Sequence, residues 1–408
     1  MKKYFQLFEE CILVYNSINE GAIYNLLSGD VFQYNYNETN ILSLCEKKYS
    51  IEQVIELLNI SSESVFCFLD KLEIANLGFY SDQPVYVEKM LIDYNWRELS
   101  FIKDRPVVEK AYILLNNSCK CNCIYCDENH IRMNGCIGCF KNTNNSNKET
   151  TVEEYFMALD KLKLLGVNTI FFSGGNFFSD FKKNIKIVNY AKNLFIKNIV
   201  LFLGSNQRVE NEYLEELKRL DVDICIQVPV QDKESIYNNF LLNDVKGKLP
   251  FSVILVFDVM HDNAMKNNVI QECLAFYNPL KIYTDLTVDI KQINKMPKGQ
   301  MFELRRTSIY DFNLSQVYNR CMNGLLSITA NKMITVCPRI NEPIGEIDNF
   351  IDSLSSEKLN KYWRLTKDKI KGCKGCNIRY ICKDCRYIEM NLSGDLYGNQ
   401  SCFSDLSK

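Results

Sequence analysis

The sequence predicts an α/β protein whose central part, residues 109–300, is a partial (β/α)6 barrel. In this region short apolar runs alternate with stretches that have a helical spacing of apolar residues. The runs are rich in Ile, Val and Phe and are apolar on both faces, which is typical of parallel strands covered by helices. A small module with its own strand and helix patterns, residues 1–85, precedes this region. A cysteine-rich segment, residues 301–408, follows it. We therefore expect a chain of several parts.

The expected strands and helices of the central part alternate along the chain. The strands are KAYILLNNS, NTIFFSGGN, NIVLFLGSN, DICIQVPV, SVILVFDV and YTDLTVDI. The helices are TVEEYFMALDKLKLLG, NIKIVNYAKNLF, NEYLEELKRL and AMKNNVIQECLAFY. Repeated βα units of this kind build a parallel sheet with helices packed on it.

Residues 1–85 predict a winged-helix-like module. ECILVYN and AIYNLLSGDVFQYNY have the composition of short strands, and Ser28-Gly29-Asp30 marks a hairpin turn in the second stretch. Helical spacing follows in NETNILSLCE, YSIEQVIELLN and SSESVFCFLDKLEIANL. The expected N-caps of these helices are Asn37, Ser50 and Ser61 or Ser62. Residues 86–108 differ in character and are the expected linker.

Composition and charge argue against several classes of protein. Of the 408 residues, 47% are hydrophobic and 24% are charged, which is the range of soluble globular proteins. The net charge of -2 gives no general attraction to nucleic acid or to anionic lipid. The N-terminus shows no apolar signal region, and no apolar run reaches the roughly 18 residues of a membrane span. We expect a cytoplasmic protein that binds neither nucleic acid nor membrane.

The 18 cysteines, beside only two histidines, are the main anomaly of the composition. Cytosolic thiols are kept reduced and rarely form structural disulfides, so this number favours metal binding. One group lies in residues 119–139 and a second in residues 321–402. The other cysteines lie among apolar residues and are expected in the core: Cys11, Cys45, Cys67, Cys225 and Cys273.

The first group contains Cys119-x3-Cys123-x2-Cys126, directly after the first strand of the βα series. Three closely spaced thiolates can hold three corners of a 4Fe-4S cluster and leave one iron open to a small chelating ligand. With Tyr125 before the last cysteine, this loop resembles the signature of the radical SAM superfamily, although Cys121 does not fit the spacing. The alternatives are a zinc site and coincidental core cysteines.

This resemblance implies that the open iron chelates the methionine part of S-adenosyl-L-methionine (SAM). An electron from the cluster cleaves SAM to a 5'-deoxyadenosyl radical, which abstracts a substrate hydrogen. Gly174-Gly175-Asn176 follows the second strand and resembles the family's Gly-Gly-Glu motif for the SAM amino group, with Asn176 in place of the acid. Ser205, Asn206 and Gln227 are expected to face the same pocket. No pattern indicates a catalytic side chain.

The second group has seven cysteines, too many for one cluster, which takes four. Its centre is Cys373-x2-Cys376-x5-Cys382-x2-Cys385, and the group resembles the SPASM extension of radical SAM peptide maturases, which carries two auxiliary 4Fe-4S clusters. The resemblance implies two ligand sets: Cys321, Cys337 and Cys385 for the first auxiliary cluster, and Cys373, Cys376, Cys382 and Cys402 for the second. Together with the SAM cluster, three 4Fe-4S clusters are expected.

The cysteine-rich segment departs from the SPASM pattern at a few positions. Only Lys383 and Asp384 separate the last pair of cysteines, and Lys332 stands where a glycine usually precedes Cys337. Ser327 occupies the place where some members have a fourth ligand of the first auxiliary cluster, so that iron could be open to a substrate thiolate. Paired Cys-x2-Cys units also form zinc ribbons, which are the alternative.

Cys136-x2-Cys139 has no single interpretation. The pair could hold part of another metal site, assist sulfur or redox chemistry, or fix the insertion that contains it. A polar tract, residues 141–150, follows the pair.

The N-terminal module resembles the leader-recognition elements of ribosomal peptide maturases, in which a leader peptide adds a strand to a sheet edge. The CKDCR run resembles maturases of the grasp-with-spasm type. These resemblances imply a radical SAM enzyme that binds a ribosomally made precursor peptide through residues 1–85 and installs a thioether or carbon-carbon crosslink. A flavodoxin or ferredoxin is the kind of reductant implied.

Other functions stay open at this point. Epimerisation or decarboxylation of a peptide would use the same motifs. An enzyme that modifies a folded protein, as in anaerobic sulfatase maturation, would not need residues 1–85. A non-catalytic protein could use its cysteines to bind zinc and its barrel to bind a peptide.

Overall fold

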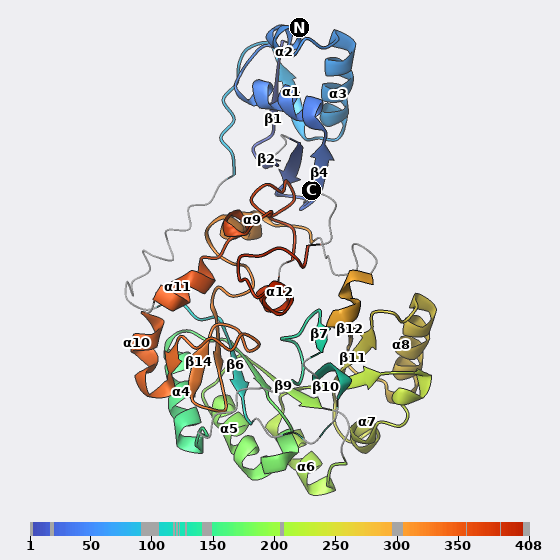
Figure 1. Cartoon of the computed structure of the whole chain (residues 1–408), viewed down its shortest axis with the longest axis vertical. Helices are drawn as coiled ribbons and strands as arrows, with labels where there is room; N and C mark the ends of the chain where they lie inside the picture. Colours follow the sequence, from blue (N-terminus) through green and yellow to red (C-terminus); the bar gives the residue numbers. More distant parts are fainter. Residues whose placement is uncertain are drawn as a thin grey trace.

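The structure is a computed structural model. It describes residues 3–16, 20–90, 106–116, 119, 121, 123–126, 129–140, 149–204, 208–295, 305–355, 357–383 and 385–402. The N-terminal module lies at one end of the molecule and the βα region at the other, with much of the C-terminal part between them (Figure 1). Within the described residues, no helix is both long and apolar enough to cross a membrane.

A large, mainly parallel sheet forms the βα region. Among the described residues it has ten strands, in the order β15-β14-β13-β6-β8-β9-β10-β11-β12-β7. Neighbouring strands from β13 to β12 pair in parallel. They include every strand predicted in the central part: β6 (Lys110–Leu114), β8 (Thr169–Ser173), β9 (Asn198–Gly204), β10 (Asp223–Val230), β11 (Ser252–Asp258) and β12 (Ile282–Asp289). The predicted α/β class is confirmed.

The sequence does not predict the strands at the two ends of this sheet. They are β7 (His130–Arg132), β13 (Leu325–Ile328), β14 (Met333–Thr335) and β15 (Gly345–Glu346). β7 pairs antiparallel with β12, whereas β13 pairs parallel with β6. Because β13, β14 and β15 come from the cysteine-rich segment, that segment and the βα region share one sheet.

Helices cover the outer face of the parallel strands (Figure 1). They are α4 (Val152–Leu164), α5 (Phe181–Asn193), α6 (Asn211–Leu220), α7 (Phe240–Val245) and α8 (Asn263–Tyr277). Their apolar sides and the strands build one large core, in which Leu159 and Val188 are fully buried. This packing occupies the outer face of the sheet, so it leaves the inner face and the strand ends for a site.

The N-terminal module contains the predicted strands and helices. Its antiparallel sheet consists of β2 (Cys11–Tyr15), β3 (Gly21–Asn25) and β4 (Val31–Tyr34), in that order. Its helices are α1 (Tyr36–Glu46), α2 (Ile51–Leu58) and α3 (Ser62–Ile74). A further antiparallel pair, β1 (Tyr4–Leu7) and β5 (Gly78–Ser81), is not predicted by the sequence.

One predicted helix cap is wrong. Asn35, not Asn37, caps α1: its side chain accepts a hydrogen bond from the Glu38 backbone N–H at 3.0 Å. The Glu38 carboxylate accepts one from the Asn35 backbone N–H at 3.1 Å, which completes a capping box. Asn37 lies within the first turn. Ser50 and Ser61 cap α2 and α3 as predicted.

The prediction that Cys67 lies in the core is also wrong. Cys67 is exposed, because α3 turns Val65, Phe68 and Leu69 toward the core and leaves position 67 outside that stripe. The other cysteines of this set are buried as expected: Cys11, Cys45, Cys225 and Cys273.

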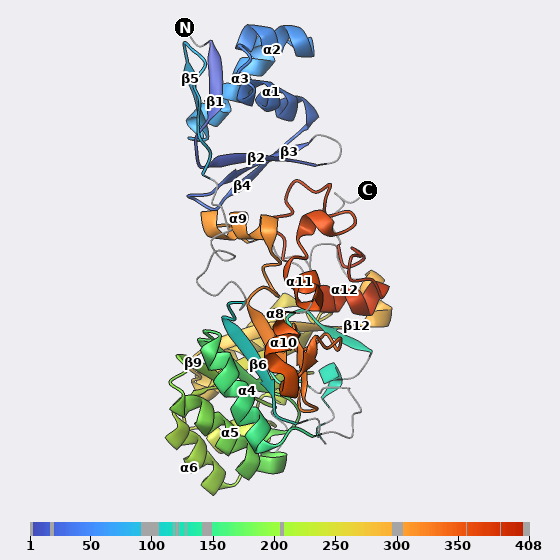
Figure 2. The same cartoon turned by 90° about the vertical axis from the view of Figure 1, so that its left-hand side faces the viewer.

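The sheet of the N-terminal module packs on the C-terminal part (Figure 2). Tyr24 of β3 belongs to a buried cluster with Phe312 and Tyr380. The Tyr24 hydroxyl also donates a hydrogen bond to the Asn377 carbonyl at 2.8 Å. The module is therefore anchored directly on residues 376–382.

The cysteine-rich segment has little regular structure. Its helices are α9 (Ile309–Val317), α10 (Phe350–Leu354), α11 (Glu357–Trp363) and α12 (Arg386–Ser393). Lys332, where the SPASM pattern has glycine, adopts a left-handed φ of 70°. Such a backbone suits glycine, and here it belongs to a lysine whose ammonium pairs with Glu154 of α4.

Candidate functional site

The carboxyl ends of β6 and β8 carry the first two motifs. The cysteine loop follows β6, and Gly174-Gly175-Asn176 follows β8, its parallel neighbour. The Asn116 side chain, at the start of the cysteine loop, donates a hydrogen bond to the Asn176 carbonyl at 2.9 Å. Ligands of parallel α/β folds bind at this edge of the sheet. The two motifs therefore share one site.

The thiols of the first group lie near one another. A single turn, Ile124–Cys126, brings the Cys126 backbone N–H within 2.9 Å of the Cys123 carbonyl, to which it donates. Burial, together with the neighbouring thiols Cys126 and Cys119, raises the pKa of the Cys123 thiol to about 11. A bound metal centre would reverse this shift, because a coordinated thiol is deprotonated. Three thiols placed in this way have the ligand chemistry that a 4Fe-4S cluster requires at three of its irons.

Tyr125 is buried beneath this turn. It packs with Tyr112 and Phe202, which lie on the inner face of the sheet. The Arg132 guanidinium lies over the Tyr125 ring, 5.3 Å from its centre. Tyr125 thus fixes the cysteine turn on the sheet and contacts the main polar network of the site.

Gly174 and Gly175 form a close turn, and the side-chain oxygen of Asn116 lies near it. Gly174 and Gly175 have left-handed φ angles of 94° and 58°. A Cβ on Gly174 would lie 3.0 Å from the Asn116 carbonyl oxygen, so only glycine fits. The Asn176 side chain accepts a hydrogen bond from the Phe178 backbone N–H at 2.9 Å. Asn116 Oδ1 is buried and has no hydrogen-bond partner among the described residues, which suits a ligand with N–H donors.

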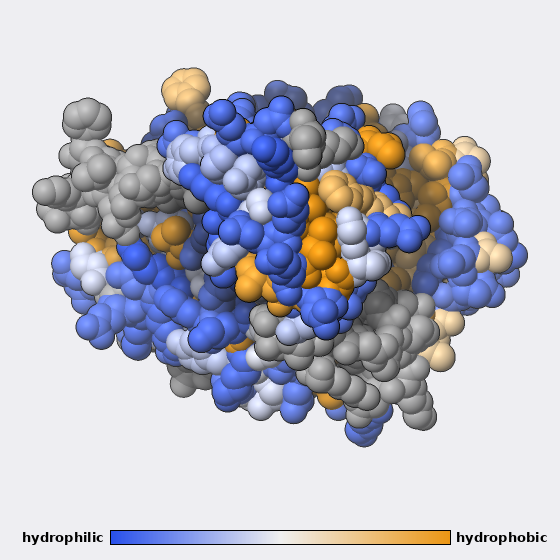
Figure 3. Space-filling view, turned by 90° about the horizontal axis from the view of Figure 1, so that it is seen from above, coloured by the Kyte–Doolittle hydropathy of each residue, from blue (hydrophilic) through white to orange (hydrophobic). Residues whose placement is uncertain are grey.

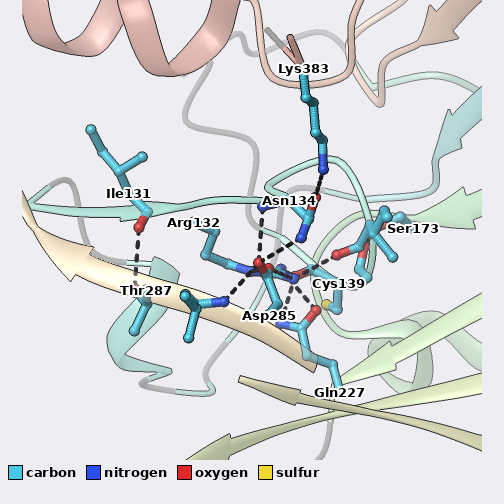
Figure 4. A network of polar contacts seen from close by, with 12 residues as sticks. Ile131, Arg132, Asn134, Cys139, Ser173, Gln227, Asp285, Thr287 and Lys383 are labelled. Atoms are coloured by element: carbon cyan, nitrogen blue, oxygen red, sulfur yellow. Dashed lines mark hydrogen bonds and ion pairs between the residues drawn. The ribbon is translucent and has the colours of Figure 1, made fainter. Parts of the chain in front are cut away.

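A buried ion pair holds residues 133–140 against the sheet (Figure 4). Arg132 Nε donates to Asp285 Oδ2 of β12 at 2.8 Å, and both side chains are nearly inaccessible to solvent, 1% and 2% exposed. Arg132 Nη1 donates to Gln227 Oε1 of β10 at 2.9 Å. Arg132 Nη2 donates to the Ile137 carbonyl at 2.6 Å. One guanidinium therefore connects two strands with the loop.

Further contacts fix the same loop. The Ser173 hydroxyl donates to the Gly138 carbonyl at 2.8 Å, and the Asn134 backbone N–H donates to Asp285 Oδ1 at 2.9 Å. The Lys383 ammonium, from the cysteine-rich segment, donates to the Asn134 side chain. Figure 4 shows Lys383 reaching toward the loop from the opposite side to the sheet. The loop is thus bound from both sides.

Cys139 lies with the first cysteine group. Its thiol donates to the Gly175 carbonyl at 3.2 Å, and its carbonyl accepts a hydrogen bond from Gln227 Nε2 at 3.0 Å. Burial raises the pKa of Cys139 well above its usual value, and the neighbouring thiols of Cys126 and Cys119 add to this effect. Cys139 therefore lies beside the glycine pair and the first cysteine group.

Cys136 lies with the second group, although only two residues separate it from Cys139. It lines a cavity of about 260 Å³ together with Cys321, Cys382 and Cys385. Its thiol lies close to the Tyr112 hydroxyl. Cys136 also packs on the apolar cluster that Cys123 and Cys126 contact, so it lies at the boundary between the two groups.

Cysteines of the second group also line a smaller cavity of about 60 Å³, which shares two of them with the larger cavity. Its cysteines are Cys373, Cys382, Cys385 and Cys402. The thiol of Cys376 lies close enough to that of Cys402 for the two to interact electrostatically. Lys367 Nζ lies 3.7 Å from Cys382 Sγ, where its positive charge would compensate thiolates. Within the described ranges, no three His, Cys, Asp or Glu side chains are close enough to share a single metal ion, and the thiols line cavities instead.

Some residues of the site are not found from the sequence motifs. Arg132 and Tyr112 belong to no motif, and only the structure brings them to the cysteines. Asp285 did carry a signal, since it is a charged residue in the middle of strand β12. Ser205, Asn206 and Asp384, which the sequence analysis singles out, lie outside the described residues.

Residues 113–240 match the family model of the Radical SAM superfamily. The chain carries a radical SAM domain. The matched range includes the first cysteine group, the glycine pair and Gln227 of this domain. The family implies SAM and one 4Fe-4S cluster as the cofactors of this domain.

Several solved structures are similar to this chain. Streptococcus suis SuiB bound to the precursor peptide SuiA is 14% identical, with 99% of this chain and 100% of that chain covered and a TM-score of 0.47. SuiB bound to S-adenosylmethionine is 13% identical, with the same coverage and a TM-score of 0.44. BtrN in complex with AdoMet and 2-DOIA is 11% identical, covers 69% of this chain and 95% of its own, and has a TM-score of 0.35. No curated protein matches the chain.

Proposed function

We propose that this radical SAM enzyme is a peptide maturase that binds a precursor peptide and crosslinks it through a thioether or carbon-carbon bond. The contact between the N-terminal module and the cysteine-rich segment carries the proposal. Tyr24 of β3 donates to the Asn377 carbonyl, and Arg379 donates to the Tyr15 carbonyl of β2 at 3.1 Å. A module able to bind a peptide strand is thereby held beside the candidate cluster ligands in residues 376–382.

The edge of β4 is the proposed docking site for the leader peptide. In the described part of the module sheet, β4 pairs with β3 on one side only. Phe32 and Tyr34 share the side of β4 that faces the helices, and the Tyr34 ring packs on Phe68 of α3 at 5.3 Å. Phe32 remains 37% exposed. An added strand would gain backbone hydrogen bonds and contact with these aromatic rings.

The module surface supports a binding role. Seen from the module's end of the molecule, apolar surface gathers in one area with hydrophilic residues around it (Figure 3). Among the large apolar side chains exposed on the module, Leu27 and Phe32 lie at the β3–β4 hairpin, whereas Leu57 and Ile74 lie on α2 and α3. Apolar surface that gathers in this way marks interaction sites more often than single exposed residues do.

Cys119, Cys123 and Cys126 would hold the 4Fe-4S cluster, and the turn at Gly174 and Gly175 would receive SAM. These residues fit the cofactors for two reasons. The thiols lie in a single loop, and the buried oxygen Asn116 Oδ1 has no hydrogen-bond donor among the described residues. When bound, SAM and the cluster supply a 5'-deoxyadenosyl radical that abstracts a substrate hydrogen. Asn116 would then accept a hydrogen bond from a SAM N–H group.

The polar network would shape and seal the reaction space. Arg132 and Asp285 hold residues 133–140 between the sheet and the cysteine-rich segment. Gln227 supports the same loop through Cys139. A closed loop at this place excludes water, which would otherwise quench reactive intermediates.

The cysteines of the second group would hold two auxiliary clusters that accept electrons removed from the substrate. The cavities that they line and the neighbouring cations Lys367 and Lys383 fit such groups, because the cations offset the negative charge of several thiolates. A low-potential donor such as a flavodoxin or ferredoxin would supply the electron that starts each turnover.

A direct test combines the anaerobically reconstituted enzyme with SAM, dithionite and a small peptide encoded beside its gene. Mass spectrometry of the peptide should show the loss of two hydrogens for each crosslink, with 5'-deoxyadenosine as the co-product. Loss of carbon dioxide would indicate decarboxylation, and deuterium uptake from heavy water without loss of hydrogen would indicate epimerisation. Unmodified peptide in the presence of SAM cleavage would contradict the assignment of this peptide as substrate.

A further inference from the structure

We propose that Cys136 is the fourth ligand of the first auxiliary cluster. The inference rests on the proposed function, because it requires that the auxiliary cluster exists. The sequence analysis left one iron of this cluster open, whereas here all four irons would have a thiolate ligand. Three ligands come from the cysteine-rich segment, Cys321, Cys337 and Cys385, and Cys136 comes from the βα region.

The first step is the shared cavity. Cys136, Cys321 and Cys385 line the same space of about 260 Å³. The buried thiol of Cys337 lies in electrostatic contact with Cys136 and Cys385. Thiols from distant parts of the chain thus surround one volume. Its polar lining includes Lys383, whose charge would offset the thiolates.

The second step is the residue at the expected fourth position. Ser327 lies on β13, directly opposite Tyr112 of β6. Its hydroxyl is fully buried and has no hydrogen-bond partner within the described residues. The Tyr112 hydroxyl in turn lies close to the Cys136 thiol. Cys136 therefore brings a thiol to the side of the sheet where the sequence has serine in place of a ligand.

The third step is the loop that carries Cys136. Asn134 is held by Asp285 through its backbone N–H and by Lys383 through its side chain. The Ile137 backbone N–H donates to the Asn134 carbonyl at 2.8 Å, which closes a turn around Cys136. Rigid support of this kind is what a metal ligand requires. Cys382 and Cys385 both line this cavity and the smaller one, but it is Cys385 that lies near the thiol of Cys337.

A cluster with four protein thiolates has no iron open to a substrate. The first auxiliary cluster would then serve electron transfer alone. Its ligand from residues 133–140 would also tie the loop above the SAM motif to the cysteine-rich segment. Loss of the cluster would therefore loosen the loop that carries Cys139.

The test uses full-length protein that lacks the SAM cluster through Cys119→Ala, Cys123→Ala and Cys126→Ala. This protein is reconstituted anaerobically, and its iron, acid-labile sulfide and reduced EPR spectrum are measured with and without 2-mercaptoethanol. We expect iron and sulfide for two clusters and no change on addition of the thiol. Adding Cys136→Ser should make the signal of one cluster respond to the thiol. The matched control Cys139→Ser should leave both signals unresponsive.

The possible results separate the inference from the proposed function. A thiol response while Cys136 is intact, or none in Cys136→Ser protein, overturns the ligand assignment and leaves the auxiliary clusters in place. Absence of iron and sulfide in the starting protein overturns the clusters themselves. Cys136→His keeps a ligand at this position and guards against misfolding of the serine variant. If the assignment is correct, it shifts the signal of one cluster without added thiol, and an unchanged spectrum contradicts it.

Discussion

Arg132 Nη2 and Asp285 Oδ2 lie 2.6 Å apart in an ion pair that is almost completely buried. The pair joins a residue of β7 to a residue of β12. It also holds the loop of residues 133–140, which contains Cys136 and Cys139. Several properties of the site depend on it.

Asp285→Ala should reduce the free energy of unfolding by about 3–5 kcal/mol, because it leaves the Arg132 charge buried without a partner. Urea unfolding of the metal-free protein measures this loss. The control is Lys371→Ala, which breaks an exposed ion pair with Asp395 and should cost at most about 1 kcal/mol. Equal losses for Asp285→Ala and Lys371→Ala would contradict the role of the buried pair.

Lys332→Gly should be more stable than Lys332→Ala by about 1 kcal/mol, a reversal of the usual order. Both variants lose the pair with Glu154, so their difference reports the backbone. The left-handed φ of 70° penalises any residue with a Cβ by about 1–2 kcal/mol, which exceeds the extra chain entropy of glycine. Thermal unfolding of the two proteins side by side tests this. A more stable alanine variant would show that the backbone at this position is not left-handed.

Glu389→Gln should destabilise the protein at neutral pH by about 2 kcal/mol, because charged acceptors form the stronger hydrogen bonds. The buried carboxylate accepts from the backbone N–H groups of Gln400 and Ser401, next to Cys402. Burial alone would raise the pKa of Glu389, but these hydrogen bonds outweigh it and lower the pKa below 4.5.

The pH dependence of this effect has a definite sign. A depressed pKa in the folded state contributes stability that is present above the unfolded pKa and is lost as the pH falls through the folded value. The difference between wild-type and Glu389→Gln should therefore be constant near pH 7 and shrink below pH 4.5. Glu357→Gln, at an exposed site on α11, is the control. A difference that grows toward acid would reverse the argument.

Phe32→Ser should weaken binding of the leader peptide by about tenfold or more, since aromatic contacts at the centre of an interface contribute about 2 kcal/mol or more. Fluorescence anisotropy of a labelled leader measures the dissociation constant. Leu57→Ser removes a comparably apolar and more exposed side chain from α2, so it serves as the matched control. Equal effects of the two substitutions would argue against docking at β4.

The sequence predicts the parallel strands well, because a strand buried between helices is apolar on both faces and its pattern is local. It also contains the signal for the correct cap of α1, since Glu38 lies three residues after Asn35, not after Asn37. The edge strands β7, β14 and β15 are too short to leave a pattern of their own.

The arrangement of the site is less accessible to sequence reasoning. Arg132 and Asp285 are 153 positions apart, and nothing local indicates that they meet. Cys136 and Cys139 have the spacing of a shared metal site, yet the turn between them directs one to each cysteine group. Spacing alone does not determine the direction of a thiol, because that direction depends on contacts with distant strands.

The most direct test of the account is reductive SAM cleavage by the anaerobically reconstituted protein. With dithionite and SAM, the wild-type protein should be brown and should form 5'-deoxyadenosine. Cys126→Ala should abolish the product, while Cys67→Ala, at an exposed thiol on α3, should retain it. A colourless protein, or equal product from the Cys126→Ala variant, would contradict a radical-generating cluster at the first cysteine group.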